Sequence, residues 1–246
     1  MRIALLGYGR MGHTVEDVAV SRGHEVIRRI DPASPDTDDP DRPLENADVA
    51  FVFTTPEAVW ESVTMAAEAG VDLVVGSTGW SDHLREVESA VQSAGIGMIH
   101  SPNFSMGVYV FRRLAAAAAR MIDGLEGYDV RVHETHHEHK LDHPSGTAIA
   151  LAEILVGGLS SKHRWEEEEE RGVGSDAGTL YVACTRTGEV AGIHEIEITG
   201  PDDRLALKHV AKGRRAFAKG AVAAAEWIHG RKGIYTMDDW LGGADR

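Results

Sequence analysis

The residues of this chain with the greatest potential for chemistry lie between positions 133 and 147. Histidine occurs at positions 133, 136, 137, 139 and 143, and Lys140 stands among them. These side chains are common proton donors and acceptors in enzymes. An apolar run with helical spacing follows at 148–155, so Ser145, Gly146 and Thr147 stand where a helix begins. A helix N-terminus favours carboxylates, and the sequence therefore predicts a site for a small acidic substrate.

A zinc-protease interpretation of the same stretch is possible, because residues 133–137 match the pattern H-E-x-x-H. That pattern chelates zinc only on a helix, where residues four apart share a face. Residues 129–134 instead alternate with the period of a half-buried strand, and on a strand positions 133 and 137 would be about 13 Å apart. We therefore predict no metal site, and for His139 and His143 we expect ordinary solvated loop positions.

The elements that must position this chemistry begin at the first residue. An apolar run at 2–6 leads into Gly7, Gly9 and Gly12, and helical spacing of apolar residues follows. In a dinucleotide-binding turn the first glycine makes the tight turn, the second lets the backbone approach pyrophosphate, and the third packs helix against strand. Arg10 and Met11 belong to the same turn.

A second strand is predicted at 24–30 and is followed by Asp31, about 20 residues after the turn. An acid in this position can accept hydrogen bonds from the adenosine ribose. The alternative for Asp31 is an ordinary turn acid, since Asp36, Asp38 and Asp39 follow closely.

Strands and helices continue to alternate, with strands predicted at 48–53, 71–75 and 96–99 and helices at 56–69 and 81–94. This order predicts a doubly wound parallel sheet. Small polar loops follow three strand ends, and we expect them to line the nicotinamide half of a cofactor site at that edge. Any one of them alone would be ordinary turn chemistry. The loops are 54–56, 76–80 and 101–105.

The pattern changes after residue 105. A helix is predicted at 106–122, followed by longer strands at 128–135, 179–186, 193–199 and 204–210, and residues 157–178 are predicted to form a mobile solvated loop. A helix at 217–229 with a short tail is expected to return to the first domain. The predicted fold is α/β: a Rossmann-like doubly wound sheet (1–103, completed by 217–246) and a second α+β domain (104–216) with a mixed open sheet.

Composition narrows the function class. The chain has 246 residues, of which 43% are hydrophobic, enough for two domains with their own cores. A net charge of −14 disfavours nucleic acid as a partner. The single Cys184 excludes an internal disulfide, and no apolar run approaches a membrane span. A cytoplasmic enzyme without a membrane partner is expected.

The motifs together resemble those of the 4-hydroxy-tetrahydrodipicolinate reductase (dihydrodipicolinate reductase) family, over essentially the whole chain. The box around the histidines, Lys140 and the Ser-Gly-Thr step is highly specific to that family. The matching segments are GRMG at 9–12, GSTG at 76–79, NFSMG at 103–107, ETHHEHKLDHPSGTA at 134–148, RTGEVAGIH at 186–194, Arg214, FAKGA at 217–221 and GIYTMDD at 233–239.

The resemblance implies an NAD(P)H-dependent reduction in the diaminopimelate route to lysine. Hydride would be transferred to ring C4 of a cyclic imine dicarboxylate, and His136 or Lys140 would protonate the adjacent carbon. By motif position the substrate contacts would be His137, Ser145, Gly146, Thr147 and Arg186. The cofactor contacts would be Gly7, Gly9, Arg10, Met11, Gly12, Asp31, Gly76, Ser77, Thr78, Ser101, Pro102, Asn103 and Phe104. The resemblance also suggests a homotetramer assembled through the sheets of the second domain.

The chain departs from the family pattern at three cofactor positions. Its glycine turn is one residue shorter than the usual GxxGxxG, Ser77 replaces the usual threonine, and Pro32 follows Asp31 where a basic residue is common. Arg28 and Arg29 alternate along the strand, so at most one of them can approach a 2′-phosphate. We predict that NADH is preferred and that NADPH remains usable.

Two other functions share the nucleotide-binding half. One is a two-domain dehydrogenase for an amino acid or a semialdehyde, such as an aspartate or homoserine dehydrogenase, which leaves the histidine-lysine box unexplained. The other is a dinucleotide-sensing protein without catalytic activity, which would have no need for His136 and Lys140 as paired proton donors.

Overall fold

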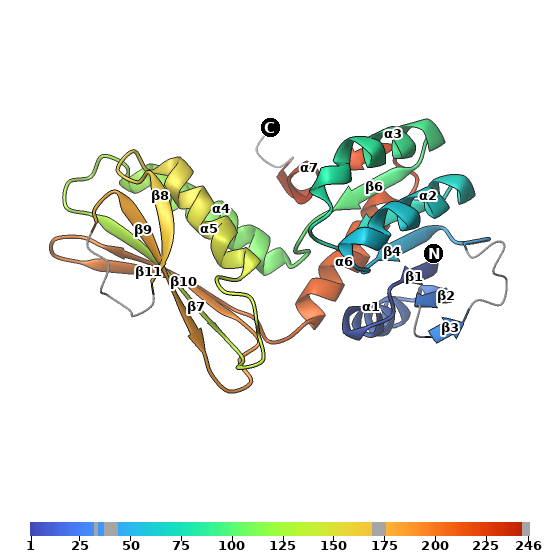
Figure 1. The fold of residues 1–246 in the computed structure, drawn as a ribbon, viewed down its shortest axis with the longest axis horizontal. Helices are drawn as coiled ribbons and strands as arrows, with labels where there is room; N and C mark the ends of the chain where they lie inside the picture. The colour runs from blue at the N-terminus through green and yellow to red at the C-terminus, as the bar shows by residue number, and fades with distance from the viewer. Residues whose placement is uncertain (32–33, 37–43, 169–175, 243–246) are drawn as a thin grey trace. The chain divides into compact units, whose positions relative to one another are not determined.

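The computed structural model describes residues 1–31, 34–36, 44–168 and 176–242. Pro32, Asp38 and Asp39, on which part of the cofactor prediction rests, lie outside the described residues. The chain divides into two compact units, Met1–Ser105 with Arg214–Arg246, and Met106–Gly213. They are called unit 1 and unit 2 (Figure 1).

Unit 1 contains one sheet of seven strands in the order β12-β6-β5-β4-β1-β2-β3. Its pairs are parallel except for the antiparallel pair at the β2–β3 edge, which confirms the predicted doubly wound parallel sheet. β4 and β5 are buried along their whole length, and apart from Asp72 their residues are apolar, as is typical of strands covered by helices on both faces. The strands are β1 (Arg2–Leu6), β2 (Glu25–Asp31), β3 (Ser34–Asp36), β4 (Val49–Val52), β5 (Asp72–Val75), β6 (Gly97–His100) and β12 (Gly233–Tyr235).

Helices cover both faces of this sheet. α1 and α6 contact each other, and α6 contacts β5 and β6, whereas α2 and α3 pack together and α2 contacts β4 and β5 (Figure 1). The predicted helices 56–69 and 81–94 each begin with a 3₁₀ turn, η1 (Pro56–Ala58) and η2 (Ser81–His83). The helices are α1 (Arg10–Ser21), α2 (Val59–Ala69), α3 (Leu84–Ala94), α6 (Arg215–Ile228) and α7 (Met237–Leu241).

The C-terminal tail belongs to unit 1. Its short strand β12 pairs in parallel with β6, and α7 follows with a capping box between Thr236 and Asp239. The sequence did not predict β12, β3 or α7, because segments of three to five residues carry too little periodicity to be recognised.

Unit 2 contains a five-stranded mixed sheet in the order β11-β10-β7-β9-β8. β10 is antiparallel to both β7 and β11, whereas β7, β9 and β8 run parallel to one another, so the predicted mixed sheet is confirmed. The elements are α4 (Met106–Ile122), β7 (Asp129–His136), α5 (Gly146–Gly158), β8 (Arg164–Glu168), β9 (Thr179–Arg186), β10 (Ile193–Thr199) and β11 (Arg204–Val210).

α4 and α5 lie together on one face of this sheet (Figure 1). The strands alternate accordingly: Val130 and Val132 of β7 join the apolar core beneath the helices, and Glu134 and His136 continue the same buried face. The polar end of an otherwise apolar strand face is where the candidate site begins.

The prediction of a solvated loop at 157–178 was wrong for part of its length. Gly157 and Gly158 end α5, and β8 pairs in parallel with β9. The side chain of Glu168 is 3% exposed and accepts a hydrogen bond of 2.7 Å from Arg131, so pairing with a cation allows this acidic segment to form a strand. Glu170 lies outside the described residues.

Within the described ranges, none of the helices combines the length and apolar character that a membrane span requires.

Candidate active site

The carboxyl ends of β6, β5, β4, β1 and β2 meet at one edge of the unit 1 sheet. Chain order reverses between the neighbours β1 and β4, and such a switch point is where doubly wound sheets bind ligands. Gly7 leaves β1 at this point with φ +90°, and its N–H donates to the carbonyl of Ile30 at 2.8 Å. A Cβ on Gly7 would lie 2.3 Å from the carbonyl oxygen of Phe53, so only glycine fits.

Gly9 and Gly12 meet opposite environments. Gly9 is the N-cap of α1, and a Cβ placed on it would have nothing within 4 Å. Gly12 is buried in the first turn of the helix, and a Cβ there would lie 2.6 Å from the carbonyl oxygen of Gly7. Gly12 therefore serves helix-to-strand packing, whereas the space beside Gly9 is open to a ligand at a helix N-terminus.

Asp31 lies at the end of β2 beside this turn. Its Oδ2 accepts a 2.9 Å hydrogen bond from the backbone N–H of Tyr8, which ties the acid to the glycine turn. Two residues earlier, the guanidinium of Arg29 binds the carboxylate of Glu16, with Nε 3.0 Å from Oε2. Hydrogen bonding from Arg29 is the main reason that the pKa of Glu16 is lowered. Arg28 donates from Nη1 to the carbonyl of Ile27.

The loops after β5 and β6 are held by their own hydroxyl groups. Ser77 donates to the carbonyl of Thr54 at 2.8 Å, and Ser101 donates to the carbonyl of Asn103 at 2.9 Å. Thr78 and Pro102 are exposed. The side chain of Phe104 is fully buried and meets the ring of Phe217 edge-on, so only its backbone can face a ligand.

The predicted proton donors lie in unit 2, where β7 ends and a loop leads to α5. His136 is the last residue of β7, and its carbonyl accepts a 2.9 Å hydrogen bond from the N–H of Thr187. Lys140 lies in the following turn and pairs with Asp142, with Nζ 2.7 and 2.8 Å from the carboxylate oxygens. His133 lies inside the strand, not on a helix, so the geometric basis of the zinc-protease motif is absent from this segment.

The start of α5 is built as the sequence predicted for a helix N-terminus. Ser145 is the N-cap, and its hydroxyl accepts from the N–H of Ala148. Gly146 is exposed, with nothing within 4 Å of an added Cβ, and Thr147 is half-buried. The first N–H groups of a helix have no intrahelical acceptor, so this end can hold an anion.

Glu134 connects the end of β7 with the start of α5 and with Arg186. Its side chain is fully buried; the N–H of Ser145 donates to both carboxylate oxygens at 3.1 Å, and Nη2 of Arg186 donates to Oε1 at 2.9 Å. The Oε2 atom lies 3.4 Å from Nδ1 of His136 and 3.7 Å from Nε2 of His194. Burial alone would raise the pKa of this carboxyl group, but hydrogen bonds from Ser145 and Arg186 and the neighbouring positive charges lower it overall.

The same surroundings shift the pKa values of His136 and His194. Burial is the main cause that lowers the pKa of His136, and the charge of Glu134 opposes that shift. His194 is more deeply buried and its pKa is lowered to about 4, so its imidazole is neutral at physiological pH. Its Nε2 lies 3.0 Å from the hydroxyl of Ser145, which can therefore donate to it.

Glu134, His136 and His194 have donor atoms that all lie within 4.8 Å of one another, a composition that can also bind a divalent metal. The two metal ligands of the H-E-x-x-H pattern would be His133 and His137, which are not in this set. Arg186 places a positive charge 2.9 Å from the carboxylate, and Ser145 supplies a hydrogen bond to it. We interpret the set as a hydrogen-bonding network, and the absence of metal remains a prediction.

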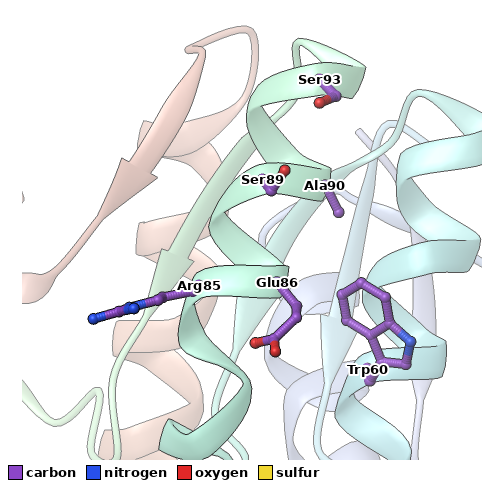
Figure 2. Close-up of a pocket in the computed structure, with 6 residues that line it drawn as sticks. All are labelled: Trp60, Arg85, Glu86, Ser89, Ala90 and Ser93. Atoms are coloured by element: carbon purple, nitrogen blue, oxygen red, sulfur yellow. The ribbon is translucent and has the colours of Figure 1, made fainter.

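One surface groove does not coincide with either group of residues. A groove of about 470 Å³ lies along α2 and α3 of unit 1, away from the glycine turn (Figure 2). It is lined by Trp60, Arg85, Glu86, Ser89, Ala90 and Ser93. None of the predicted site residues contributes to it.

Known protein families match both units of the chain. The family model described as "Dihydrodipicolinate reductase, N-terminus" matches residues 1–104, and "Dihydrodipicolinate reductase, C-terminus" matches residues 107–241. The chain belongs to the dihydrodipicolinate reductase family. Among its relatives, the 4-hydroxy-tetrahydrodipicolinate reductase of Christiangramia forsetii is 36% identical over 98% of both chains. That of Archaeoglobus fulgidus is 37% identical, covering 98% of this chain and all of the relative.

Solved structures agree on the fold. A dipicolinate-bound dihydrodipicolinate reductase from Paenisporosarcina matches with a TM-score of 0.76, covering 98% of this chain and 99% of its own, at 24% identity. An amine dehydrogenase from Mycobacterium smegmatis matches with a TM-score of 0.64 at 15% identity, covering 97% of this chain and 95% of its own.

The structure groups the predicted residues by unit. The cofactor candidates gather at one sheet edge of unit 1, and the proton-donor and substrate candidates gather around the end of β7 in unit 2. Arg186 is the candidate whose position suggests another role, because its guanidinium binds Glu134 and the carbonyl oxygens of Lys140 and Asp142.

Glu134 and His194 are site residues that the sequence motifs alone did not reveal. Their signal was positional: both are polar residues on the apolar face of an alternating strand, Glu134 beyond Val132 in β7 and His194 before Ile196 in β10. A buried ionisable side chain in that position needs partners.

Proposed function

We propose that this chain is the NAD(P)H-dependent reductase that converts 4-hydroxy-tetrahydrodipicolinate to tetrahydrodipicolinate in the diaminopimelate route to lysine. The observation that carries the proposal is the assembly at the end of β7. There the buried carboxylate of Glu134 contacts His136 and the N-terminus of α5, and it binds Arg186, which holds the backbone of the Lys140 loop. Membership of the dihydrodipicolinate reductase family over both units supports it.

The substrate is a dicarboxylate, and the loop and helix of unit 2 suit one. The N–H groups of Gly146 and Thr147 stand at the positive end of the α5 dipole, where a carboxylate is stabilised. The ammonium group of Lys140 adds a full positive charge. Asp142 holds that ammonium group in the free enzyme, so an entering carboxylate would replace one anionic partner of Lys140 with another.

The dinucleotide is assigned to unit 1, whose residues fit it. The turn after β1 has open space beside Gly9 at a helix N-terminus, which suits pyrophosphate, and Asp31 stands beside the turn for the ribose hydroxyls. The backbones of the loops at 76–78 and 101–104 are assigned to the nicotinamide half. When bound, the reduced nicotinamide supplies hydride to the substrate ring.

Lys140 and His136 are assigned the proton transfers. Reduction at ring C4 leaves electron density on the adjacent carbon, which must accept a proton. Lys140 pairs with the carboxylate of Asp142, and burial favours the neutral form of His136, so the two side chains can act as donor and as donor or acceptor in turn. A positioned acid contributes about 10²- to 10⁴-fold to such a step.

The activity is tested by a coupled assay in which purified dihydrodipicolinate synthase supplies the substrate and loss of nicotinamide absorbance is followed. We expect Lys140→Ala and His136→Ala to lower kcat by about 10²-fold or more while the dissociation constant of the cofactor stays within twofold. His139→Ala is the matched control, because His139 is exposed in the same loop. Near-wild-type turnover in both site variants would refute the assignment.

We further propose that NADH is the preferred cofactor. Asp31 would repel a 2′-phosphate, and Arg29 is engaged by Glu16. Asp31→Ala should shift the ratio of kcat/KM values toward NADPH, and Glu16→Gln, which frees Arg29, should shift it in the same direction. A strong preference of the wild-type enzyme for NADPH would show that Asp31 does not bind the ribose.

We also propose a homotetramer built through the sheets of unit 2. The sheet face opposite α4 and α5 carries His133, Glu195 and Lys208, which line a cavity of about 290 Å³. Among the described elements of unit 2, no helix covers this face. Sedimentation equilibrium tests the assembly: a monomer at micromolar concentration would refute it. We place the enzyme in the cytoplasm, where its cofactor and substrate are available.

A further inference from the structure

Glu134 is a buried carboxylate that the reaction itself does not require. It cannot donate the proton while ionised, and its side chain is completely enclosed. Burying a lone carboxylate is strongly unfavourable, so its retention at the end of an apolar strand face calls for a compensating arrangement. That arrangement consists of Ser145, Arg186 and His136.

We propose that Glu134 is a positioning residue that orients both proton donors, His136 directly and the Lys140 loop through Arg186. This inference rests on the proposed reductase activity. It adds a role for a residue whose side chain is completely enclosed.

The direct arm concerns the imidazole of His136. Its Nδ1 is buried and faces Oε2 of Glu134 at 3.4 Å, within ion-pair distance and slightly longer than a strong hydrogen bond. Such contacts are often long in free enzymes and shorten when substrate binds. With its proton directed at Glu134 from Nδ1, the ring keeps Nε2 as the reacting nitrogen.

The indirect arm concerns the loop. Arg186 extends from β9, donates to Glu134 and also donates to the carbonyl oxygen of Asp142 at 2.7 Å and to that of Lys140 at 3.3 Å. One carboxylate thus anchors the cation that holds the backbone on both sides of Leu141. Arg186 thus links Glu134 to the loop backbone. Removing the negative charge of Glu134 should weaken the hold of Arg186 on this loop, and so on Lys140, although Lys140 itself is unchanged.

The charges around His136 define what Glu134 contributes. Glu134 lies on the same strand, Arg186 comes from β9, His194 from β10, and Lys140 and Asp142 come from the loop. His194 meets the His136 ring edge-on at 5.1 Å and is neutral, so it does not compensate the charge of Glu134. The two anions are Glu134 and Asp142. Glu134 lies in the same strand as His136, and its charge favours the imidazolium form of His136 more than that of Asp142 does.

A measurement without turnover tests the direct arm. The pKa of the His136 ring can be followed by NMR in histidine-labelled protein and assigned by its loss in His136→Asn. We expect Glu134→Gln to lower this pKa by about one to three units, because an opposite charge at this distance favours the charged form. Asp72→Asn is the matched control: Asp72 is a buried carboxylate of unit 1 that accepts from the N–H groups of Gly97 and Gly230. It should leave the pKa of His136 unchanged.

Kinetics in the coupled assay test the consequence. Glu134→Gln should lower kcat at least tenfold, change the cofactor dissociation constant less than twofold, and move the pH-rate limb of His136 to lower pH. If Glu134→Gln does not fold, Glu134→Asp retains the charge on a shorter side chain; it should keep the His136 pKa near the wild-type value and still lose kcat.

The outcomes separate the two proposals. An unchanged His136 pKa in Glu134→Gln, or wild-type kcat in either Glu134 variant, would overturn the positioning role. If the wild-type enzyme fails to turn over the proposed substrate but the pKa shift is observed, the proposed function fails while the direct arm stands.

Discussion

Gly9 and Gly12, at the start of α1, should respond in opposite ways to substitution by alanine. In Gly9→Ala the added methyl group enters open space, so the fold should tolerate it, with a loss of about 1 kcal/mol or less from the poorer N-cap. In Gly12→Ala the methyl group would lie 2.6 Å from the carbonyl oxygen of Gly7, which is backbone and cannot rotate away. Overpacking of this kind costs about 1–3 kcal/mol, only partly offset by the higher helix propensity of alanine.

The effect on cofactor affinity should reverse this order. If pyrophosphate approaches the backbone at Gly9, the methyl group of Gly9→Ala occupies the space of the ligand, and NADH affinity should fall at least tenfold, or about 1.4 kcal/mol. Thermal unfolding and NADH titration by fluorescence measure the two quantities separately. Gly157→Ala in α5 is the control, because that glycine is exposed and a Cβ there also meets nothing within 4 Å.

The placement of pyrophosphate at Gly9 is refuted if Gly9→Ala binds NADH as tightly as the wild-type enzyme, because the pyrophosphate then lies elsewhere. The packing role of Gly12 is refuted if Gly12→Ala unfolds at the wild-type temperature, which would show that α1 can shift away from β1 at no cost. A stability loss in Gly157→Ala would show that the free space around a glycine does not predict tolerance.

Three further predictions concern unit 2. Thr147→Val should raise KM for the substrate more than it lowers kcat, and Gly146→Ala should raise KM further by filling the open space at the helix start; unchanged KM in both would place the carboxylate elsewhere. Elemental analysis of the purified enzyme should find no stoichiometric zinc, and activity should survive chelators, because Arg186 and Ser145 already bind the carboxylate of Glu134. One zinc per chain with inactivation by chelators would identify the Glu134, His136 and His194 set as a metal site. Burial and the nearby charge of Glu134 raise the pKa of Cys184, so iodoacetamide at pH 8 should label it only after denaturation, and stoichiometric labelling of the native enzyme would contradict this environment.

Local sequence was sufficient to predict the architecture. Uninterrupted apolar runs between helices predict a parallel sheet, and the strands 179–186, 193–199 and 204–210 and the helix 106–122 have the predicted bounds. The physical reason is that each of these segments is long enough for its periodicity to express which faces are buried. Two kinds of segment escaped prediction. β12 has only three residues, and the glutamates of β8 give it the composition of a solvated segment.

Only part of the candidate site can likewise be predicted from the sequence. His136, Lys140 and the Ser145 helix start lie within one continuous segment, so motif and spacing alone bring them together. Arg186 and His194 reach them from β9 and β10, about 50 residues further along the chain, through strand pairing with β7. Only the tertiary structure decides which distant side chains share a buried space, because the energy of a carboxylate such as Glu134 depends on the partners that the sheet register places around it.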